Sequence, residues 1–333
     1  IHIGYNRPAI FKIYLDRDAG GTVRQGAIAP VLDGFTTGLL DGRVNPQDGF
    51  LYVGGLNIWG TVGEEIRGLF RVRPTGQTSW VPEKVRSFDK GILLRFSEEL
   101  DEALATSLAS YTVDRWNYQR THNYGSGHYK LDGTPGQESL PVASAYRSTN
   151  RKSIFLGIPG MRPSDSVRVT YRVAAPGAPV IQEAYLTVRE LRAADLPALG
   201  FANRDVDLTV KETGSAGLPL PEPSPAEGQK TAAQFGCIAC HSTDGSKAVN
   251  PEPNMVVGPS WKGLYGSKRE FTDGTIVKKA DEVYLRESIL NPARNVTKGF
   301  ETEQTGVGMP SYLGVLRDDQ VESLILYIKS LRK

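Results

Sequence analysis

The stretch FGCIACHSTDG, residues 235–245, contains both cysteines of the 333-residue chain and one of its four histidines. Two residues separate Cys237 from Cys240, and His241 follows directly, which gives the pattern C-x-x-C-H. So few cysteines and histidines would form this pattern by chance on the order of once in ten thousand arrangements. The spacing therefore carries chemical information.

Four kinds of cysteine chemistry compete for this pattern. A disulfide across two residues closes a very small loop and constrains the unfolded chain little. A thioredoxin-type dithiol makes no use of the adjacent histidine, and a zinc site needs further ligands nearby. Attachment of a c-type haem uses all three residues, because Cys237 and Cys240 form thioethers and His241 binds the iron. The pattern favours one covalent haem.

The sixth position of the iron decides between electron transfer and gas or peroxide chemistry. The chain has three methionines, Met161, Met255 and Met309. Met161 lies far upstream in a turn-rich stretch, and Met255 follows His241 closely, where the chain still surrounds the histidine side. Met309, in GVGMPSYLG, leaves enough chain to cross to the other haem face. The sequence predicts Met309 as the sixth ligand.

Residues 226–333 resemble a class I cytochrome c domain, and most closely the cytochrome c tail of haem-copper oxidase subunit II. The motifs that carry the resemblance occur in family order: GQKTAAQFGCIACHS, VVGPSWKGLYG, DEVYLRESILNPARNVTKGF and MPSYLGVLRDDQVESLILYIKSL. The resemblance implies an all-α fold around one covalent haem c. It also implies that His241 and Met309 are the axial ligands, and that the Pro259 carbonyl accepts a hydrogen bond from His241.

The residue pattern of this segment independently indicates helices. Apolar residues recur at three- and four-residue steps near the C-terminus, at Val321, Leu324, Ile325, Ile328 and Leu331. A second helix should begin near Pro225, where Gly228 would let another helix approach closely. Asp281 fits the N-cap of a third helix that ends at Asn291.

Two aromatic residues and three lysines of this segment are weaker candidates for function. Trp261 and Tyr265 would wall the haem pocket or hydrogen-bond a propionate, or they are ordinary core residues. Lys262, Lys278 and Lys279 would form a docking patch or a solvated surface.

The chain before this segment is rich in β-type sequence, so the expected fold class is multidomain. Short runs of β-branched and aromatic residues, separated by turn signals, predict an antiparallel sandwich over 80–195. FSEELDEALATSLASYTVDRW (96–116) resembles bacterial Ig-like domains. A Pro- and Gly-rich linker is expected over 196–225, followed by the cytochrome c domain over 226–333.

Residues 1–79 form a further piece. VNPQDGFLYVGGLNIWGT and IRGLFRVRPTG resemble the closing blade of a sugar-dehydrogenase β-propeller, although so short a segment supplies only two blades. The remainder would precede Ile1, or the segment forms an irregular β-layer on the sandwich. The order of parts resembles secreted haem-binding dehydrogenases of planctomycete-type bacteria.

The loop 114–133, DRWNYQRTHNYGSGHYKLDG, concentrates aromatic and histidine side chains. They could form a carbohydrate-stacking or partner-docking surface, ligate a metal, or pack against the sandwich. These side chains are Trp116, Tyr118, Tyr124, Tyr129, His122 and His128.

Composition limits the function classes. A net charge of +2 argues against nucleic-acid binding, and no apolar run approaches the roughly 20 residues of a membrane span.

We expect single-electron transfer to a redox partner protein, such as a dehydrogenase, a terminal oxidase or another cytochrome. The alternatives are the C-terminal part of a sugar or alcohol dehydrogenase, and a glycan- or protein-binding module that carries a cytochrome. The resemblance to cytochromes c implies that haem is attached outside the cytoplasm, so we expect export to the periplasm or the cell surface.

Overall fold

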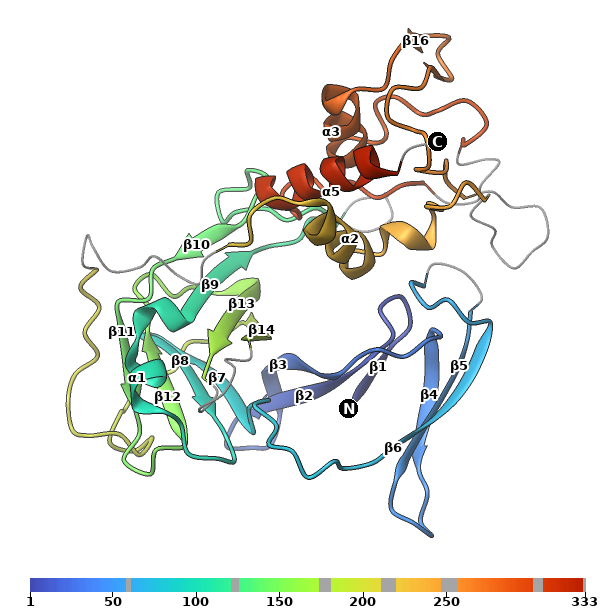
Figure 1. Cartoon of the computed structure of the whole chain (residues 1–333). Helices are drawn as coiled ribbons and strands as arrows, with labels where there is room; N and C mark the ends of the chain where they lie inside the picture. Colours follow the sequence, from blue (N-terminus) through green and yellow to red (C-terminus); the bar gives the residue numbers. More distant parts are fainter. Residues whose placement is uncertain are drawn as a thin grey trace.

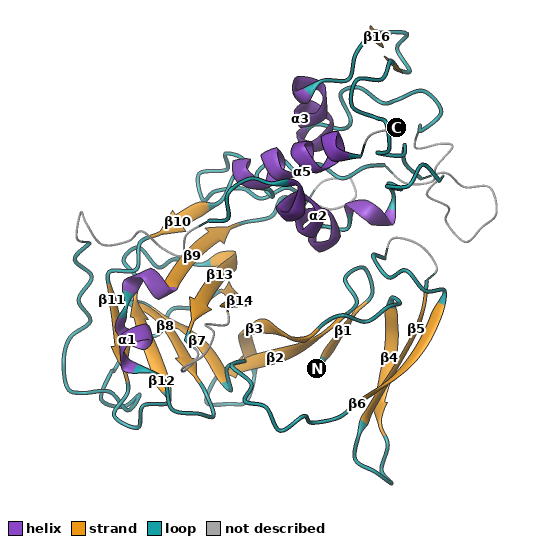
Figure 2. Ribbon diagram, in the orientation of Figure 1, coloured by secondary structure: helices purple, strands orange, loops and turns teal. Residues whose placement is uncertain are grey.

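The computed structural model describes residues 1–57, 61–120, 126–173, 181–210, 220–246, 257–301 and 308–331. Strands dominate the chain as far as Val188, and the longer helices lie after it (Figures 1 and 2). Within these ranges, no helix has the length and apolar composition that crossing a membrane requires. The division into a β-rich part and a helical C-terminal part agrees with the sequence.

Two antiparallel sheets form the larger part of the β-rich region. The first has seven strands in the order β1 (His2–Gly4), β2 (Ala9–Arg17), β3 (Val23–Leu32), β14 (Ile181–Val188), β13 (Ser164–Arg172), β9 (Tyr111–Trp116) and β10 (Glu138–Leu140). The second has four strands in the order β11 (Ser144–Arg147), β12 (Ser153–Gly157), β8 (Gly91–Arg95) and β7 (Lys84–Phe88).

The two sheets enclose one apolar core. Alternate side chains of a strand point to opposite faces, so in β8 Ile92 and Leu94 enter this core while Leu93 faces outward. Tyr171 of β13 and Ile154 of β12 are fully buried in the same core. Each such side chain contributes on the order of 2 kcal/mol through burial. The β-rich part thus contains two antiparallel sheets packed around one apolar core.

Residues 1–79 do not form a separate propeller-like body in the part that is described. Strand β3 pairs with β14 through Gly26 opposite Thr187 and Ile28 opposite Tyr185, so β1–β3 extend the sandwich sheet. Strands β4 (Leu39–Val44), β5 (Leu51–Leu56) and β6 (Arg67–Val72) form a separate three-stranded sheet. No propeller appears among the described strands, and the segment matches the irregular β-layer that we considered as the alternative.

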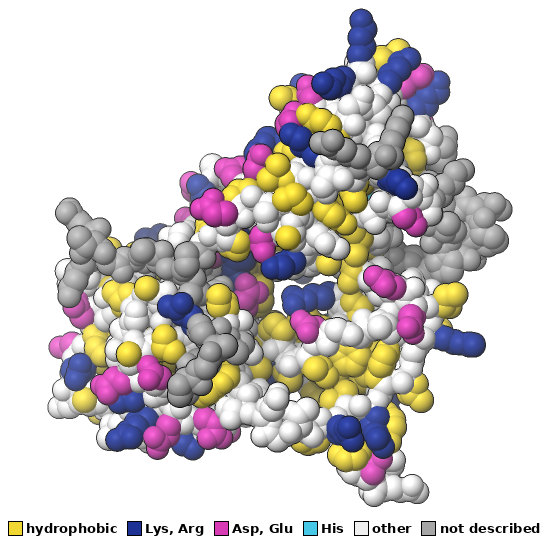
Figure 3. Space-filling model, in the orientation of Figure 1, with side chains coloured by type: hydrophobic (Ala, Val, Ile, Leu, Met, Phe, Trp, Pro, Cys, Tyr) yellow, Lys and Arg dark blue, Asp and Glu magenta, His cyan; other side chains and the backbone are white. Residues whose placement is uncertain are grey.

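The three-stranded sheet packs on β1 and β2 through a small core. Ile10 of β2 packs against Leu39 of β4 and Val53 of β5, and all three side chains are nearly inaccessible to solvent. The other face of β2 presents Ile13 and Leu15, which are 43% and 53% exposed. Figure 3 shows hydrophobic side chains gathered over this part of the surface.

The short helix that the Ig-like resemblance predicts is also present. Helix α1 (Glu102–Thr106) begins at Asp101, whose carboxylate accepts a hydrogen bond from the Leu104 amide at 2.9 Å. The Tyr111 hydroxyl donates to the Ala105 carbonyl at 2.8 Å and ties the start of β9 to this helix. The local order of strand, helix and strand is as expected, while membership of an Ig-like family stays a prediction.

The first part of the expected linker 196–225 packs against the sandwich. Its apolar residues lie on the outer face of the four-stranded sheet and cover the side chains that point away from the main core. This second cluster contains Leu196, Phe201, Val206, Phe88, Leu93 and Phe155. The linker between the two parts therefore begins later than residue 196, because the residues LPALGF (196–201) bury apolar side chains against the four-stranded sheet.

The C-terminal part is built on helices α2 (Pro225–Gln234), α3 (Glu282–Leu290) and α5 (Asp318–Ser330). The Ser224 hydroxyl caps α2 by accepting from the Glu227 amide at 3.2 Å. A β-carbon placed on Gly228 would lie 2.0 Å from the Ser323 carbonyl oxygen, so only glycine allows α2 and α5 to cross this closely. The close approach expected at Gly228 is confirmed.

Glu282 forms one of the polar contacts between helices α3 and α5, on the domain surface. Glu282 at the start of α3 accepts hydrogen bonds from Lys329 Nζ at 2.6 Å and from the Tyr265 hydroxyl at 2.7 Å. The bond from Lys329, followed by the bond from Tyr265, lowers the pKa of Glu282 to about 2.

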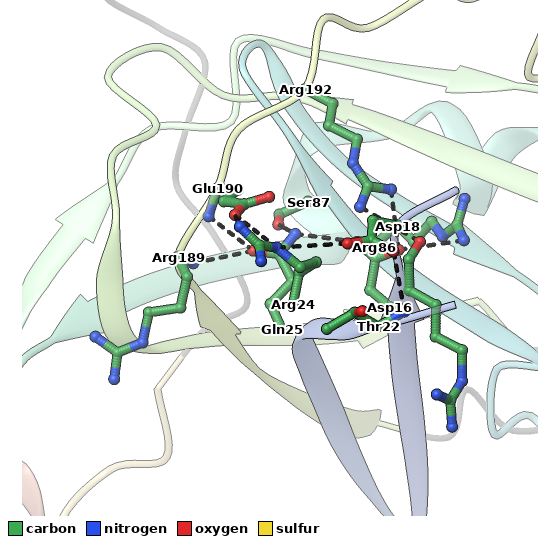
Figure 4. Close-up of polar contacts among 11 residues, drawn as sticks. Asp16, Asp18, Thr22, Arg24, Gln25, Arg86, Ser87, Arg189, Glu190 and Arg192 are labelled. Carbon is green, nitrogen blue, oxygen red and sulfur yellow. Dashed lines mark hydrogen bonds and ion pairs between the residues drawn. The ribbon is translucent and has the colours of Figure 1, made fainter. Parts of the chain in front are cut away.

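A polar cluster joins the β2–β3 hairpin to the four-stranded sheet (Figure 4). The Asp16 carboxylate is nearly buried, lies 3.2 Å from both Arg86 and Arg192, and accepts from Gln25 Nε2 at 3.0 Å. The side-chain oxygen Oε1 of Gln25 in turn accepts a hydrogen bond from the backbone amide of Arg189 at 2.9 Å. Through these bonds the N-terminal hairpin is fixed to both layers.

Replacing Asp16 tests this junction. The Asp16→Ala variant should lower the free energy of unfolding of the sandwich by about 2 kcal/mol, because two guanidinium groups and a buried amide lose their acceptor. Chemical denaturation followed by tryptophan fluorescence measures the change. Asp41→Ala is the control, since Asp41 pairs with Arg43 on the open surface, and an equal loss in both variants would contradict the assignment.

The Glu282 contact predicts a pH dependence. Because the folded pKa lies below the ordinary value of 4.5, this contact stabilises the domain fully above pH 4.5, and the contribution disappears as the pH falls towards 2. The Glu282→Gln variant should therefore lose less stability than the wild type between pH 4.5 and 2. Thermal unfolding at a series of pH values, with exposed Glu64→Gln as the control, measures this difference. Parallel curves for Glu282→Gln and wild type would contradict it.

Candidate functional site

The two cysteines lie on a tight turn directly after α2. Residues Cys237–Ala239 form a single 3₁₀ turn, in which the Cys237 carbonyl accepts from the Cys240 amide at 3.2 Å and from the His241 amide at 3.0 Å. The turn brings Cys237, Cys240 and His241 together at one end of the helical core. Neither cysteine forms a disulfide.

The imidazole of His241 is held by a backbone carbonyl. His241 is 8% exposed, and its Nδ1 lies 2.8 Å from the carbonyl oxygen of Pro259. A carbonyl can only accept, so Nδ1 carries the proton and Nε2 keeps a free lone pair. Burial lowers the pKa of His241, which keeps the ring neutral. The side chain is thus prepared to bind a metal through Nε2.

Gly258 provides the room for this arrangement. A β-carbon at this position would lie 2.9 Å from Cε1 of His241 and 2.9 Å from the Cys240 carbonyl oxygen. Any larger residue would push the ring or the turn away. The sequence Gly258-Pro259 therefore sets both the position and the hydrogen bond of the imidazole.

The thiols are poor nucleophiles in this environment. Burial raises the pKa of Cys237 to about 12 and also raises that of Cys240. Redox-active dithiols have the opposite property, because their chemistry needs a thiolate near neutral pH. The electrostatics of the turn therefore disfavour the redox dithiol that the sequence left open.

The two aromatic candidates have different surroundings. Trp261 is 5% exposed and stacks on His241, with ring centroids 5.1 Å apart and planes at 20°. The Tyr265 hydroxyl donates a hydrogen bond to Glu282, and Lys329 Nζ lies 5.0 Å from the centroid of the Tyr265 ring in a cation–π contact. Trp261 thus walls the histidine side of the site, while Tyr265 links the helices. Lys262, Lys278 and Lys279 are exposed.

The three methionines lie in three different settings. Met161 is 7% exposed within the core of the β-sandwich, where it packs between the two sheets. Met255 lies outside the described residues. Met309 is 38% exposed on the segment that precedes α5. Met161 thus belongs to the sandwich core and not to the helical core that includes Cys237.

The segment that carries Met309 is bonded to the cysteine turn and to α3. The Tyr312 hydroxyl donates to the Phe235 carbonyl at 2.9 Å, and its side chain also hydrogen-bonds the Cys237 thiol. The Ser311 hydroxyl donates to the Leu290 carbonyl at 2.6 Å. These contacts bring Tyr312, three residues after Met309, to the side of Cys237.

One arginine at the site has donors without acceptors. Nε and Nη2 of Arg269 are buried without a hydrogen-bond partner among the described residues. The positive charge of Arg269 also lowers the pKa of His241. A carboxylate that reached these donors would satisfy them with charge-assisted hydrogen bonds. Arg269 could not be predicted from the sequence, because nothing in the residues around it distinguishes it from the other arginines of the chain.

The aromatic loop 114–133 is a packing element as far as it is described. Trp116 is 3% exposed and stacks on His128 at 4.4 Å, while Tyr118 is 47% exposed. His122 and Tyr124 lie outside the described residues. Among the described residues no group of three or more metal-binding side chains gathers. Trp116 is therefore not available as a carbohydrate-stacking platform.

Comparison with known proteins identifies the C-terminal part. A family model described as Cytochrome c matches residues 225–332. Neither the curated proteins nor the solved structures gave a match to the chain. The match coincides with the helical part and includes the cysteine turn, His241, Arg269 and Met309.

The residues present fit the haem that this family implies. The thiols are unpaired and adjacent, the imidazole presents a free Nε2, and Arg269 offers buried donors for a carboxylate such as a haem propionate. Residues 225–332 are therefore a cytochrome c domain, which implies covalently bound haem c and a haem-based role in electron transfer.

Proposed function

We propose that this chain is an exported electron-transfer protein in which His241 and Met309 bind the haem iron on opposite faces. Cys237 and Cys240 would hold the haem through thioethers. Haem with histidine and methionine as axial ligands carries one electron and leaves no position for a small molecule.

The hydrogen bond between His241 and Pro259 is the observation that supports this proposal most directly. It fixes the tautomer that leaves Nε2 free, and it makes the ring a stronger donor to a metal. Trp261 covers the ring and excludes water from it. A dry, rigid ligand suits electron transfer, because little needs to rearrange when the charge of the site changes.

Met309 is the methionine that the arrangement favours as the second ligand. It lies on a segment bonded to the cysteine turn through Tyr312, whereas Met161 belongs to another core. Arg269 would bind a propionate and neutralise its charge inside the domain. Pro259, Trp261 and Arg269 thus support the group, and His241 and Met309 bind its metal.

The partner would be another redox protein, which would approach the cytochrome domain. The exposed Lys262, Lys278 and Lys279 would favour an acidic partner surface. Covalent attachment of haem implies a location outside the cytoplasm, so we propose the periplasm or the cell surface.

Substitution of Met309 tests the ligand assignment. The Met309→Ala variant should lose the weak far-red absorption band of the methionine–iron bond in the ferric state, and its reduction potential should fall. The Met161→Leu variant is the control and should change neither property, because it conserves the volume of a distant core residue. A band that survives in Met309→Ala and disappears in Met255→Ala would contradict the assignment.

A further inference from the structure

The segment that carries Met309 contacts the β-sandwich as well as its own domain. In Figure 1 the connection after β9 lies beside the start of α5. Nε2 of Gln137, directly before β10, donates to the Val315 carbonyl at 3.0 Å. The chain that follows the loop 114–133 therefore contacts the segment that carries Met309.

The two backbones approach each other closely at this contact. A β-carbon on Gly314 would lie 2.5 Å from the His128 carbonyl oxygen and 2.5 Å from the Gly136 nitrogen. Gly314 also has a φ of 73°, which residues with a side chain rarely adopt. Only glycine at position 314 allows the segment to lie against the loop.

The Gln137 amide is fully used in this contact. One Nε2 hydrogen is donated to Val315, and the other is donated to Nδ1 of His128 at 2.8 Å. Its Oε1 accepts from Nη2 of Arg168 at 3.3 Å, which fixes the orientation of the amide. Arg168 is held in turn by Asp114 at 2.7 Å. The donor to Val315 is thus oriented from within the sandwich sheet.

His128 supports the amide from the other side. Its Nδ1 accepts a hydrogen bond, so the ring is neutral with its proton on Nε2. The ring stacks on buried Trp116 at an angle of 14°. Burial lowers the pKa of His128 to about 4, in agreement with a neutral ring. The ring is therefore a rigid acceptor.

We propose that the β-sandwich clamps the distal-ligand segment 308–317, with Gln137 and His128 as positioning residues that keep Met309 on the iron. This inference rests on the proposed function, in which Met309 is the sixth ligand. Tyr312 and Ser311 hold the segment from the cytochrome side, and Gln137 holds it from the sandwich side. The clamp would keep the fraction of molecules with a detached methionine low.

An external ligand reports this fraction, because it binds ferric iron only when the methionine is detached, and its apparent affinity scales with that fraction. We would titrate the ferric full-length haem protein with imidazole. Loss of one such hydrogen bond should raise the apparent imidazole affinity of Gln137→Ala about threefold to tenfold. The far-red band should weaken and the reduction potential should fall in the same variant.

Two further variants separate positioning from folding. Gln137→Met keeps the length of the side chain but donates no hydrogen bond, so it should resemble Gln137→Ala while the sandwich stays folded. Gly314→Ala breaks the contact from the cytochrome side and should raise the affinity at least as much. Thr134→Ala is the control and should match the wild type, because the Thr134 hydroxyl donates to nearby Asp132 and not to the segment that carries Met309.

The outcomes distinguish this inference from the proposed function. If the wild type has the far-red band but Gln137→Met and Gly314→Ala bind imidazole like Thr134→Ala, the clamp is wrong and the ligand assignment stands. If the wild type lacks the band and Met309→Ala leaves the spectrum unchanged, the ligand assignment is wrong, and the clamp as stated falls with it.

Discussion

The hydrogen bond from Nδ1 of His241 to the Pro259 carbonyl is the interaction on which the rest of the site depends. It decides which ring nitrogen is free, it aligns the ring, and it requires the missing side chain of Gly258. The 3₁₀ turn from Cys237 then places the thiols next to the same ring. The Pro259 carbonyl thus connects the cysteine turn to the loop that contains Gly258 and Pro259.

The second constraint is the support of the segment before α5. Within the domain, Tyr312 ties it to the cysteine turn, and the crossing of α2 and α5 at Gly228 fixes the helix that follows. Outside the domain, Gln137 reaches the same segment from the sandwich. In this account the β-rich part does more than carry the cytochrome, because it takes part in setting how firmly the sixth ligand is held.

The chemistry of the attachment turn and the main helices could be predicted from the sequence, because they depend on short spacings. The pattern from Cys237 to His241 and the cap at Asp281 are local, and local rules describe them. The pairing of β3 with β14 could not be predicted, because the sequence of a strand does not specify which other strand it pairs with. The surroundings of Arg269 and Gln137 could not be predicted for the same reason, because they form only when distant segments meet.

The most direct test of the account is the reaction of the reduced protein with carbon monoxide. If His241 and Met309 fill both axial positions, the folded ferrous protein should bind no carbon monoxide on mixing, and binding should appear only on unfolding or in Met309→Ala. Rapid binding by the folded wild type would show an open position on the iron and would contradict the account.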